Sequence, residues 1–166
     1  MEYWEKINNE LTPWVDTALN QTVIDLFAGC GGLSLGFEAH GFKTIGYEMD
    51  KNAAKTYNHN LIGDCVNETL TVDSTYPAAD IVIGGPPCQP FSVGGKQLGL
   101  KDSRDGFPIF LSAIKQLEPE FFLFENVRGM LYKNKWYLEE VVQELGKLGY
   151  SINYALLNAV HYEVPQ

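Results

Sequence analysis

The sequence has no hydrophobic run long enough to cross a membrane. None of its apolar stretches approaches the ~18 residues that suggest a membrane-spanning helix. Met1 to Glu10 carry charges among their apolar residues, so they lack the continuous hydrophobic stretch of a secretory signal. We therefore expect no membrane partner and a cytoplasmic location.

Cysteine is scarce, with three residues at Cys30, Cys65 and Cys88, and no two of them form a CxxC pair. Structural metal sites and disulfide frameworks use closely spaced or numerous cysteines. We therefore expect no metal site, and free thiols in a reducing compartment.

Positive charge is also scarce, because 12 Lys and Arg face 21 Asp and Glu, for a net charge of -9. Proteins that hold nucleic acid unaided usually present a basic face that displaces phosphate counterions. The chain by itself is therefore expected to bind DNA poorly. On charge alone, an acidic domain that never meets a polyanion is the simpler interpretation.

Strand and helix patterns alternate from Thr22 onward, the order typical of an α/β fold with a mostly parallel sheet covered by helices. The length suits one domain, so we predict an N-terminal extension over 1–21 and a single domain over 22–166. Strands are predicted at Thr22–Phe27, Lys43–Glu48, Ala79–Gly84, Glu120–Glu125 and Ser151–Leu157. Helices are predicted at Leu33–His40, Lys51–Asn60, Pro108–Gln116 and Trp136–Leu148.

A glycine turn, Ala28-Gly29-Cys30-Gly31-Gly32, leads from the first predicted strand into a helix. Such a turn lets backbone N–H groups approach a ligand closely, although Ser34 stands where the dinucleotide pattern has its third glycine. Glycines that only make a tight turn are the alternative.

Two acids follow the glycine turn. Glu48 closes the second strand, about 20 residues on, where a carboxylate can accept hydrogen bonds from a ribose. Asp64 is predicted to end the next short strand at the same edge, where it would hold an adenine amino group. Either acid alone is more often a solvated surface residue, but in series with the turn they predict a nucleoside pocket.

A cysteine braced by prolines follows the strand at Ala79–Gly84. Pro86 and Pro87 fix the backbone, so Cys88 is predicted to lie in one defined place beside the nucleoside pocket. A thiol there suits nucleophilic chemistry, although a free cysteine is more often a small buried hydrophobic residue.

Glu125 ends another buried strand and is predicted to reach the same edge of the sheet as Cys88. A partly desolvated glutamate can donate a proton at neutral pH. The alternative is a glutamate that caps a helix or pairs with Arg128.

Three blocks together resemble, in this order, the signatures of the DNA cytosine-5 methyltransferase family: Asp25 to Gly32, Gly85 to Ser92, and Glu125 to Gly129. The resemblance covers Thr22 to Gln166. It implies a doubly wound, Rossmann-like fold that binds S-adenosylmethionine, releases S-adenosylhomocysteine, and methylates a cytosine swung out of double-stranded DNA. A restriction-modification system is the implied setting.

The resemblance also implies roles for individual residues. Cys88 would attack cytosine C6, and Glu125 would engage N3 and the exocyclic amine. The cofactor would contact Phe27, Gly29, Cys30, Gly32, Glu48, Met49, Asp64, Cys65 and Pro87. The DNA would contact Gln89, Ser92, Arg104, Val127 and Arg128.

The family pattern continues beyond Gln166 into an arginine-rich turn, a further strand, a target-recognition domain and a final helix. The further strand pairs, in the family, with the strands predicted at Glu120–Glu125 and Ser151–Leu157. The resemblance therefore implies a fold incomplete at the C-terminus and an isolated chain that is inactive. A complementary C-terminal chain or subunit carrying the target-recognition domain would restore the activity, unless this is a truncated gene or a fragment.

Two other functions stay open at this point. RNA cytosine is an alternative substrate on the same scaffold, and a non-catalytic cofactor-binding partner is an alternative to an enzyme. Cys88 and Glu125 together favour the enzyme.

Overall fold

The computed structural model describes residues 2–87, 105–132 and 134–164. The chain forms two compact units, Met1–Asn126 and Val127–Gln166.

The first unit contains a five-stranded sheet in the order β3-β2-β1-β4-β5, and every neighbouring pair is parallel. Its strands are β1 (Thr22–Leu26), β2 (Lys43–Glu48), β3 (Asp64–Asn67), β4 (Ile81–Gly84) and β5 (Phe121–Phe124). The order reverses between β1 and β4, which is the point where open α/β sheets bind ligands. The predicted parallel sheet is confirmed.

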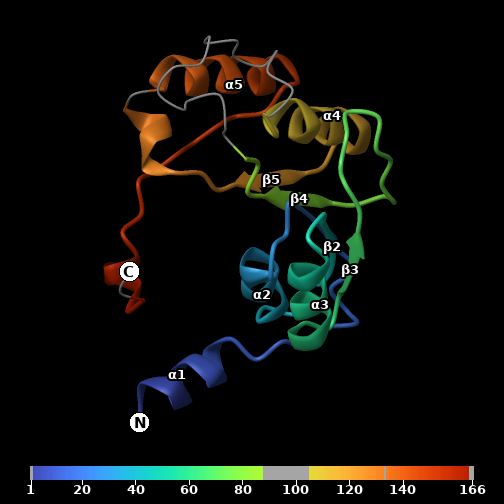
Figure 1. Cartoon of the computed structure of the whole chain (residues 1–166), viewed down its shortest axis with the longest axis vertical. Coiled ribbons are helices and arrows are strands. Elements are labelled where there is room, and N and C mark those ends of the chain that lie inside the picture. The colour runs from blue at the N-terminus through green and yellow to red at the C-terminus, as the bar shows by residue number, and fades with distance from the viewer. Residues whose placement is uncertain (1, 88–104, 133, 165–166) are drawn as a thin grey trace. The chain divides into compact units, whose positions relative to one another are not determined.

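Helices cover both faces of this sheet (Figure 1), namely α2 (Gly32–Glu38) and α3 (Lys51–Asn60) on one face and α4 (Phe107–Leu117) on the other. On the first face, Leu33 and Phe37 of α2 pack against Val23, Ile81 and Ile83.

On the other face, Phe110 of α4 makes edge-to-face contacts with Phe122 and Phe124 of β5. Neighbouring residues in a strand point to opposite faces, so each buried strand supplies side chains to both helix layers. The doubly wound arrangement follows from this alternation.

The N-terminal segment begins with α1 (Tyr3–Glu10), none of whose residues is buried. Residues beyond it attach to the end of α2. The backbone N–H of Trp14 donates to the carbonyl of Glu38, its indole N–H donates to the carbonyl of Ala39, and the N–H of Asp16 donates to the carbonyl of Gly41. These bonds satisfy backbone acceptors that the end of a helix leaves unpaired.

The second unit contains η2 (Arg128–Leu131), α5 (Lys135–Lys147) and η3 (Ala159–Tyr162). The predicted helix is confirmed, and Tyr137, Leu138, Val141 and Leu145 form its buried face. The predicted strand at Ser151–Leu157 is wrong, because residues 151–158 form neither strand nor helix. A strand exists only with a hydrogen-bonded neighbour, and in the part of the chain that the structure describes β5 pairs with β4 alone.

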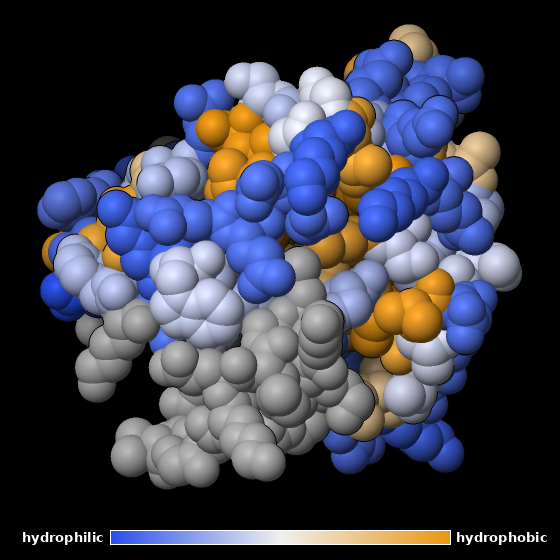
Figure 2. All heavy atoms as spheres, turned by 90° about the horizontal axis from the view of Figure 1, so that it is seen from above, coloured by the Kyte–Doolittle hydropathy of each residue, from blue (hydrophilic) through white to orange (hydrophobic). Residues whose placement is uncertain are grey.

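Figure 2 shows hydrophobic side chains interspersed among hydrophilic ones on the face that it draws. Among the described helices, none has the length and apolar character needed to cross a membrane.

Candidate active site

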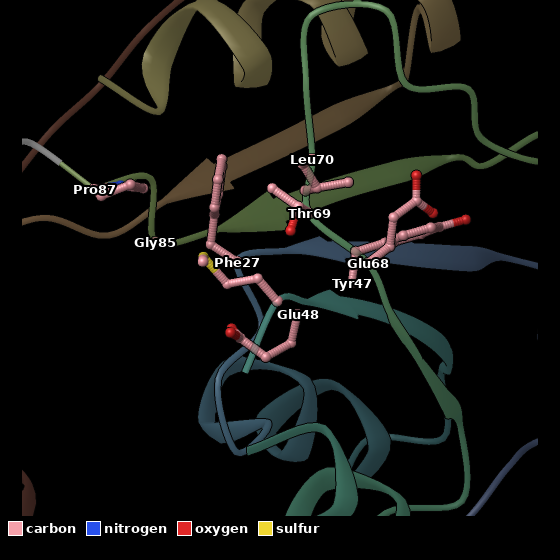
Figure 3. A pocket seen from close by; sticks show the side chains of 9 residues that line it. Phe27, Tyr47, Glu48, Glu68, Thr69, Leu70, Gly85 and Pro87 are labelled. Carbon is pink, nitrogen blue, oxygen red and sulfur yellow. The ribbon is translucent and has the colours of Figure 1, made fainter. Parts of the chain in front are cut away.

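The glycine turn bends sharply where β1 ends. Gly29 and Gly31 have φ values of 55° and 90°, in the left-handed region that glycine adopts without strain. Phe27 has a φ of 60°, which is unusual for a residue with a side chain and is typical of functional turns. This conformation places the Phe27 side chain in the wall of a cleft (Figure 3).

Glu48, at the end of β2, is fixed beside the glycine turn. Its Oε2 accepts a hydrogen bond from the N–H of Gly29 at 2.9 Å, and its Oε1 accepts one from the N–H of Asp50 at 2.7 Å. The side-chain amide of Asn67 donates to the carbonyls of Glu48 and Met49, at 2.9 Å each. The Glu48 carboxylate therefore links β2 to the glycine turn, and the backbone at the same residue is linked to β3.

The cleft has a volume of about 260 Å³ and lies at the carboxyl ends of the strands. Figure 3 shows Glu48 on the side of the glycine turn, and Glu68 on another side, beyond Thr69 and Leu70. The lining residues are Phe27, Tyr47, Glu48, Met49, Glu68, Thr69, Leu70, Gly85 and Pro87.

Asp64 does not lie where the sequence placed it. It is the first residue of β3, opposite Ile45, whereas Glu48 at the end of β2 lies opposite Asn67. Asp64 is exposed at the far end of the strand from the cleft, and the acid after β3 that lines the cleft is Glu68. The expectation that Asp64 ends its strand is therefore wrong.

Cys65 is part of a core cluster with Ala28, Ala54 and Tyr57 and does not line the cleft. Its backbone N–H and carbonyl both bond to the side chain of Asn58. Burial, together with the nearby Glu48 and Asp25, raises the pKa of its thiol to about 11. A buried thiol of this kind is chemically inert.

Asp25 lies buried in β1, two residues before Phe27, with 1% of its surface exposed. Burial raises its pKa from 3.8 to about 6, and the hydrogen bond from Ser34 opposes that rise. Its Oδ2 accepts the Ser34 hydroxyl at 2.7 Å, while its Oδ1 has no hydrogen-bond partner among the described residues. No separate role was predicted for Asp25 from the sequence.

The proline turn after β4 is held from two directions. The Asn126 side-chain amide donates to the carbonyl of Pro86, and the N–H of Gly106 donates to the carbonyl of Pro87, both at 2.9 Å. A Cβ added to Gly106 would lie 2.4 Å from Pro87 Cδ, so this contact admits only glycine. Cys88, which follows Pro87 in the sequence, lies outside the described residues.

Glu125 reaches the same turn. Its N–H donates to the carbonyl of Gly84 at 3.0 Å, and its Oε2 lies 3.9 Å from the position that a Cβ on Gly85 would occupy. Gly85 lines the cleft, so the carboxylate and the cleft meet at this edge of the sheet. The partial desolvation expected of Glu125 is not provided by the described residues, because its side chain is exposed.

The other predicted residues divide into three groups. Of the cofactor residues, Phe27, Glu48, Met49 and Pro87 line the cleft, and Gly29, Cys30 and Gly32 belong to the turn beside it. Gln89, Ser92 and Arg104 lie outside the described residues. Val127 is exposed, and Arg128 places its guanidinium 5.0 Å from the ring centre of Tyr132.

Five cleft residues were not predicted as binding residues: Tyr47, Gly85, Glu68, Thr69 and Leu70. Locating the carboxyl end of β3 would have identified the last three. Within the described ranges, no cluster of three or more His, Cys, Asp and Glu side chains could hold a metal ion.

Solved structures share this fold. A ribosomal protein L11 methylase from Lactobacillus delbrueckii subsp. bulgaricus superposes with a TM-score of 0.54 at 12% identity, over 86% of this chain and 67% of that one. A TehB-like SAM-dependent methyltransferase from Corynebacterium glutamicum has a TM-score of 0.51 at 15% identity, over 75% and 64%. The first unit therefore has the Rossmann-like fold of SAM-dependent methyltransferases.

The sequence is similar to type II methyltransferases. M.AplI from Arthrospira platensis is 55% identical over 169 residues, which are 100% of this chain and 48% of that protein. M.FnuDI from Fusobacterium nucleatum and M.HaeII from Haemophilus aegyptius are each 40% identical, over 87% and 86% of this chain and 43% and 46% of those proteins. The chain thus spans about half the length of these curated relatives. The model of the C-5 cytosine-specific DNA methylase family matches residues 21–166, and the chain belongs to that family.

Proposed function

We propose that this chain supplies the cofactor-binding and catalytic part of an enzyme that methylates C5 of cytosine in DNA. The cofactor is S-adenosylmethionine, and the product is S-adenosylhomocysteine. One observation supports the proposal above others. The cleft, the proline turn that leads into Cys88, and the Glu125 carboxylate all meet at one edge of the sheet.

The cleft suits the nucleoside part of this cofactor. Phe27, Met49, Leu70 and Pro87 offer apolar surface to an adenine ring. Each oxygen of Glu48 accepts one backbone N–H and keeps a second acceptor site, so both can receive a ribose hydroxyl. Glu68 takes the role that the sequence gave to Asp64, as acceptor for the adenine amino group. When bound, the cofactor supplies an electrophilic methyl group.

The two catalytic residues are Cys88 and Glu125. Cytosine C5 is a poor nucleophile, but adding the Cys88 thiolate at C6 while Glu125 protonates N3 makes C5 electron-rich. C5 then forms a bond to the methyl group as the methyl–sulfonium bond breaks, which leaves S-adenosylhomocysteine. The C5 proton passes to water, N3 returns its proton to Glu125, and the sulfur–C6 bond breaks to release the Cys88 thiolate. Both groups are required, because addition without the proton would leave a negative charge on the ring.

The proposed substrate is double-stranded DNA within a restriction-modification system, since the relatives are type II methyltransferases. Flipping a cytosine out of the duplex costs a few kcal/mol, which protein–DNA contacts must offset. The net charge of -9 leaves few such contacts to this chain, where Gln89, Ser92, Arg104, Val127 and Arg128 are the proposed ones.

We propose that a complementary part carrying the target-recognition domain completes the enzyme. Two facts support it: the relatives are about twice as long, and β5 is the last strand of the sheet among the described residues. Phe121 and Leu123 of β5 are 50% and 39% exposed. An edge strand with exposed apolar side chains is a template for strand addition.

The test reconstitutes the enzyme. This chain is mixed with the part of M.AplI beyond the matched half, and DNA containing 5-fluorocytosine is added with the cofactor. We expect a covalent protein–DNA adduct that is lost in Cys88→Ala and strongly reduced in Glu125→Gln. The same oligonucleotide as RNA is expected to give no adduct.

Three results would contradict the proposal. An adduct that survives Cys88→Ala would exclude the assigned nucleophile, and an adduct with RNA alone would exclude the DNA substrate. Full methylation by this chain without the added part would exclude the need for a complement.

A further inference from the structure

A chain of hydrogen bonds runs beneath the glycine turn through five buried side chains. Asp25 Oδ2 accepts the Ser34 hydroxyl at 2.7 Å, and Ser34 Oγ accepts the Tyr57 hydroxyl at 2.9 Å. The Tyr57 oxygen lies 2.7 Å from Thr44 Oγ1, which donates to Glu38 Oε1 at 2.5 Å. At least 99% of the surface of each of these side chains is buried.

The two ends of this hydrogen-bond chain lie in segments that lead to cleft residues, although neither end lines the cleft itself. Asp25 lies in β1 just before Phe27. At the other end, Glu38 Oε1 also accepts the N–H of Gly63, and its Oε2 accepts the N–H of Ile62, both at 2.8 Å. These two N–H groups lie immediately before β3, the strand that leads to Glu68.

Tyr57, on α3, is the middle residue and also fills the space beneath the turn. A Cβ added to Gly31 would lie 2.7 Å from Tyr57 Cδ2, and a Cβ added to Gly46 would lie 2.8 Å from Tyr57 Cε2. The ring therefore packs against both the glycine turn and β2. Its hydroxyl is the link between the side chain on α2 and the side chain on β2.

We propose that Tyr57 is a positioning residue for the cofactor cleft, which holds the glycine turn and the start of β3 in their binding arrangement without touching the ligand. Tyr57 is not among the residues that line the cleft. Removing its hydroxyl leaves Ser34 and Thr44 without their shared partner, so the turn and the Ile62–Gly63 segment gain other arrangements. Only part of the population is then competent to bind, and the apparent affinity falls by that fraction.

The test measures the affinity of the purified chain for S-adenosylmethionine and S-adenosylhomocysteine by calorimetry, together with unfolding in urea. For Tyr57→Phe we expect affinity for both ligands to fall about fivefold, the equivalent of one hydrogen bond, under conditions where the variant is fully folded. Tyr154→Phe removes a hydroxyl from a side chain that is 57% exposed, and it serves as the control with unchanged affinity.

Variants of Thr44 separate positioning from simple loss of stability. Thr44→Val is expected to weaken affinity as Tyr57→Phe does, whereas Thr44→Ser keeps the hydroxyl and restores the affinity. Because the two residues act in one chain, the double variant Tyr57→Phe/Thr44→Val should lose little more than either single variant.

Two outcomes would overturn this role. If Tyr57→Phe lowers the free energy of unfolding while the folded variant binds as tightly as wild type, the hydroxyl is structural only. If the losses of affinity in Tyr57→Phe and Thr44→Val add fully in the double variant, the two hydroxyls act independently and the series of hydrogen bonds does not position the cleft as a whole. Failure of the wild-type chain to bind either ligand would instead reject the cofactor site itself.

Discussion

The buried carboxyl group of Asp25 predicts an unusual dependence of stability on pH. The hydrogen-bond chain has four contacts, but Ser34, Tyr57 and Thr44 supply only three hydroxyl protons. With Asp25 ionised, the contact between Tyr57 and Thr44 has no proton to share. A proton on Asp25 completes the chain, because Asp25 can then donate to Ser34, and the Ser34 and Tyr57 hydroxyls can turn from donating toward Asp25 to donating toward Glu38.

The magnitude follows from the raised pKa. Asp25 titrates near 3.8 in the unfolded chain and near 6 in the folded protein, mainly because burial disfavours its charge. Since the folded state then binds the proton more tightly, this group contributes stability that is fully present below pH 3.8 and is lost as the pH rises through about 6. At 1.36 kcal/mol for each pKa unit, the loss amounts to about 3 kcal/mol.

Asp25→Asn removes this titration, because an amide stays neutral and can donate to Ser34 as the protonated acid does. Its second N–H finds no acceptor among the described residues, which costs about 1–3 kcal/mol at every pH. We therefore expect the variant to be less stable than wild type at pH 4. Between pH 4 and pH 7.5 the wild type should lose about 2.4 kcal/mol of stability relative to the variant, because part of the unfolded chain is already protonated at pH 4.

The assay is urea unfolding of both proteins at a series of pH values. Asp73→Asn, which neutralises an exposed carboxylate, is the matched control and should leave the wild-type profile unchanged. The titratable groups near Asp25 are Glu48, Glu38, Tyr57 and Cys65, and all of them are present in both proteins. If the profiles of wild type and Asp25→Asn run parallel, Asp25 does not carry the proton.

Two further predictions concern the N-terminal segment and the cleft of the first unit. Trp14→Ala should lower the free energy of unfolding by about 2 kcal/mol in a urea titration, since the half-buried indole packs on Gly41 and donates a hydrogen bond to the carbonyl of Ala39. The control is Trp4→Ala, at a side chain 71% exposed, which should change the free energy of unfolding by less than about 0.5 kcal/mol. Glu68→Gln should weaken S-adenosylmethionine binding about tenfold by calorimetry while Asp64→Asn leaves it unchanged, and the reverse result would restore Asp64 to the cleft.

Most of the first unit was predictable because its sequence patterns are local. The strands β1, β2, β4 and β5 are short runs of β-branched or aromatic residues next to glycine, proline or an acid, and all four appear within two residues of their predicted ends. Glu48 was found for the same reason, since it closes a strand that its own composition reveals. The turn residues Phe27 and Gly29 follow from the strand that precedes them.

The segment 151–158 shows where local patterns stop being enough. Its alternation of polar and apolar residues suits a strand, but a strand also needs a neighbour, and composition does not contain the neighbour. The hydrogen-bond chain was hidden for a related reason. Asp25, Thr44 and Tyr57 are far apart in the sequence, and nothing in the residues around each one indicates that hydrogen bonds connect them.

Glu68 could have been identified from the sequence, because the wrong expectation about Asp64 concerned only its position along the strand. Glu48 was identified because it follows the glycine turn by about 20 residues, the length of a helix with its two connections and a strand. The same spacing of about 20 residues, counted onward from Glu48, ends at Glu68, whereas Asp64 follows Glu48 by a shorter interval. The structure gives the reason. The Glu38 carboxylate accepts hydrogen bonds from the N–H groups of Ile62 and Gly63, so β3 begins at Asp64, and in the strand register Asn67 pairs with Glu48. An acid at the start of a parallel strand lies at the opposite edge of the sheet from an acid at its end, so Glu68 lines the cleft together with Glu48 and Asp64 does not.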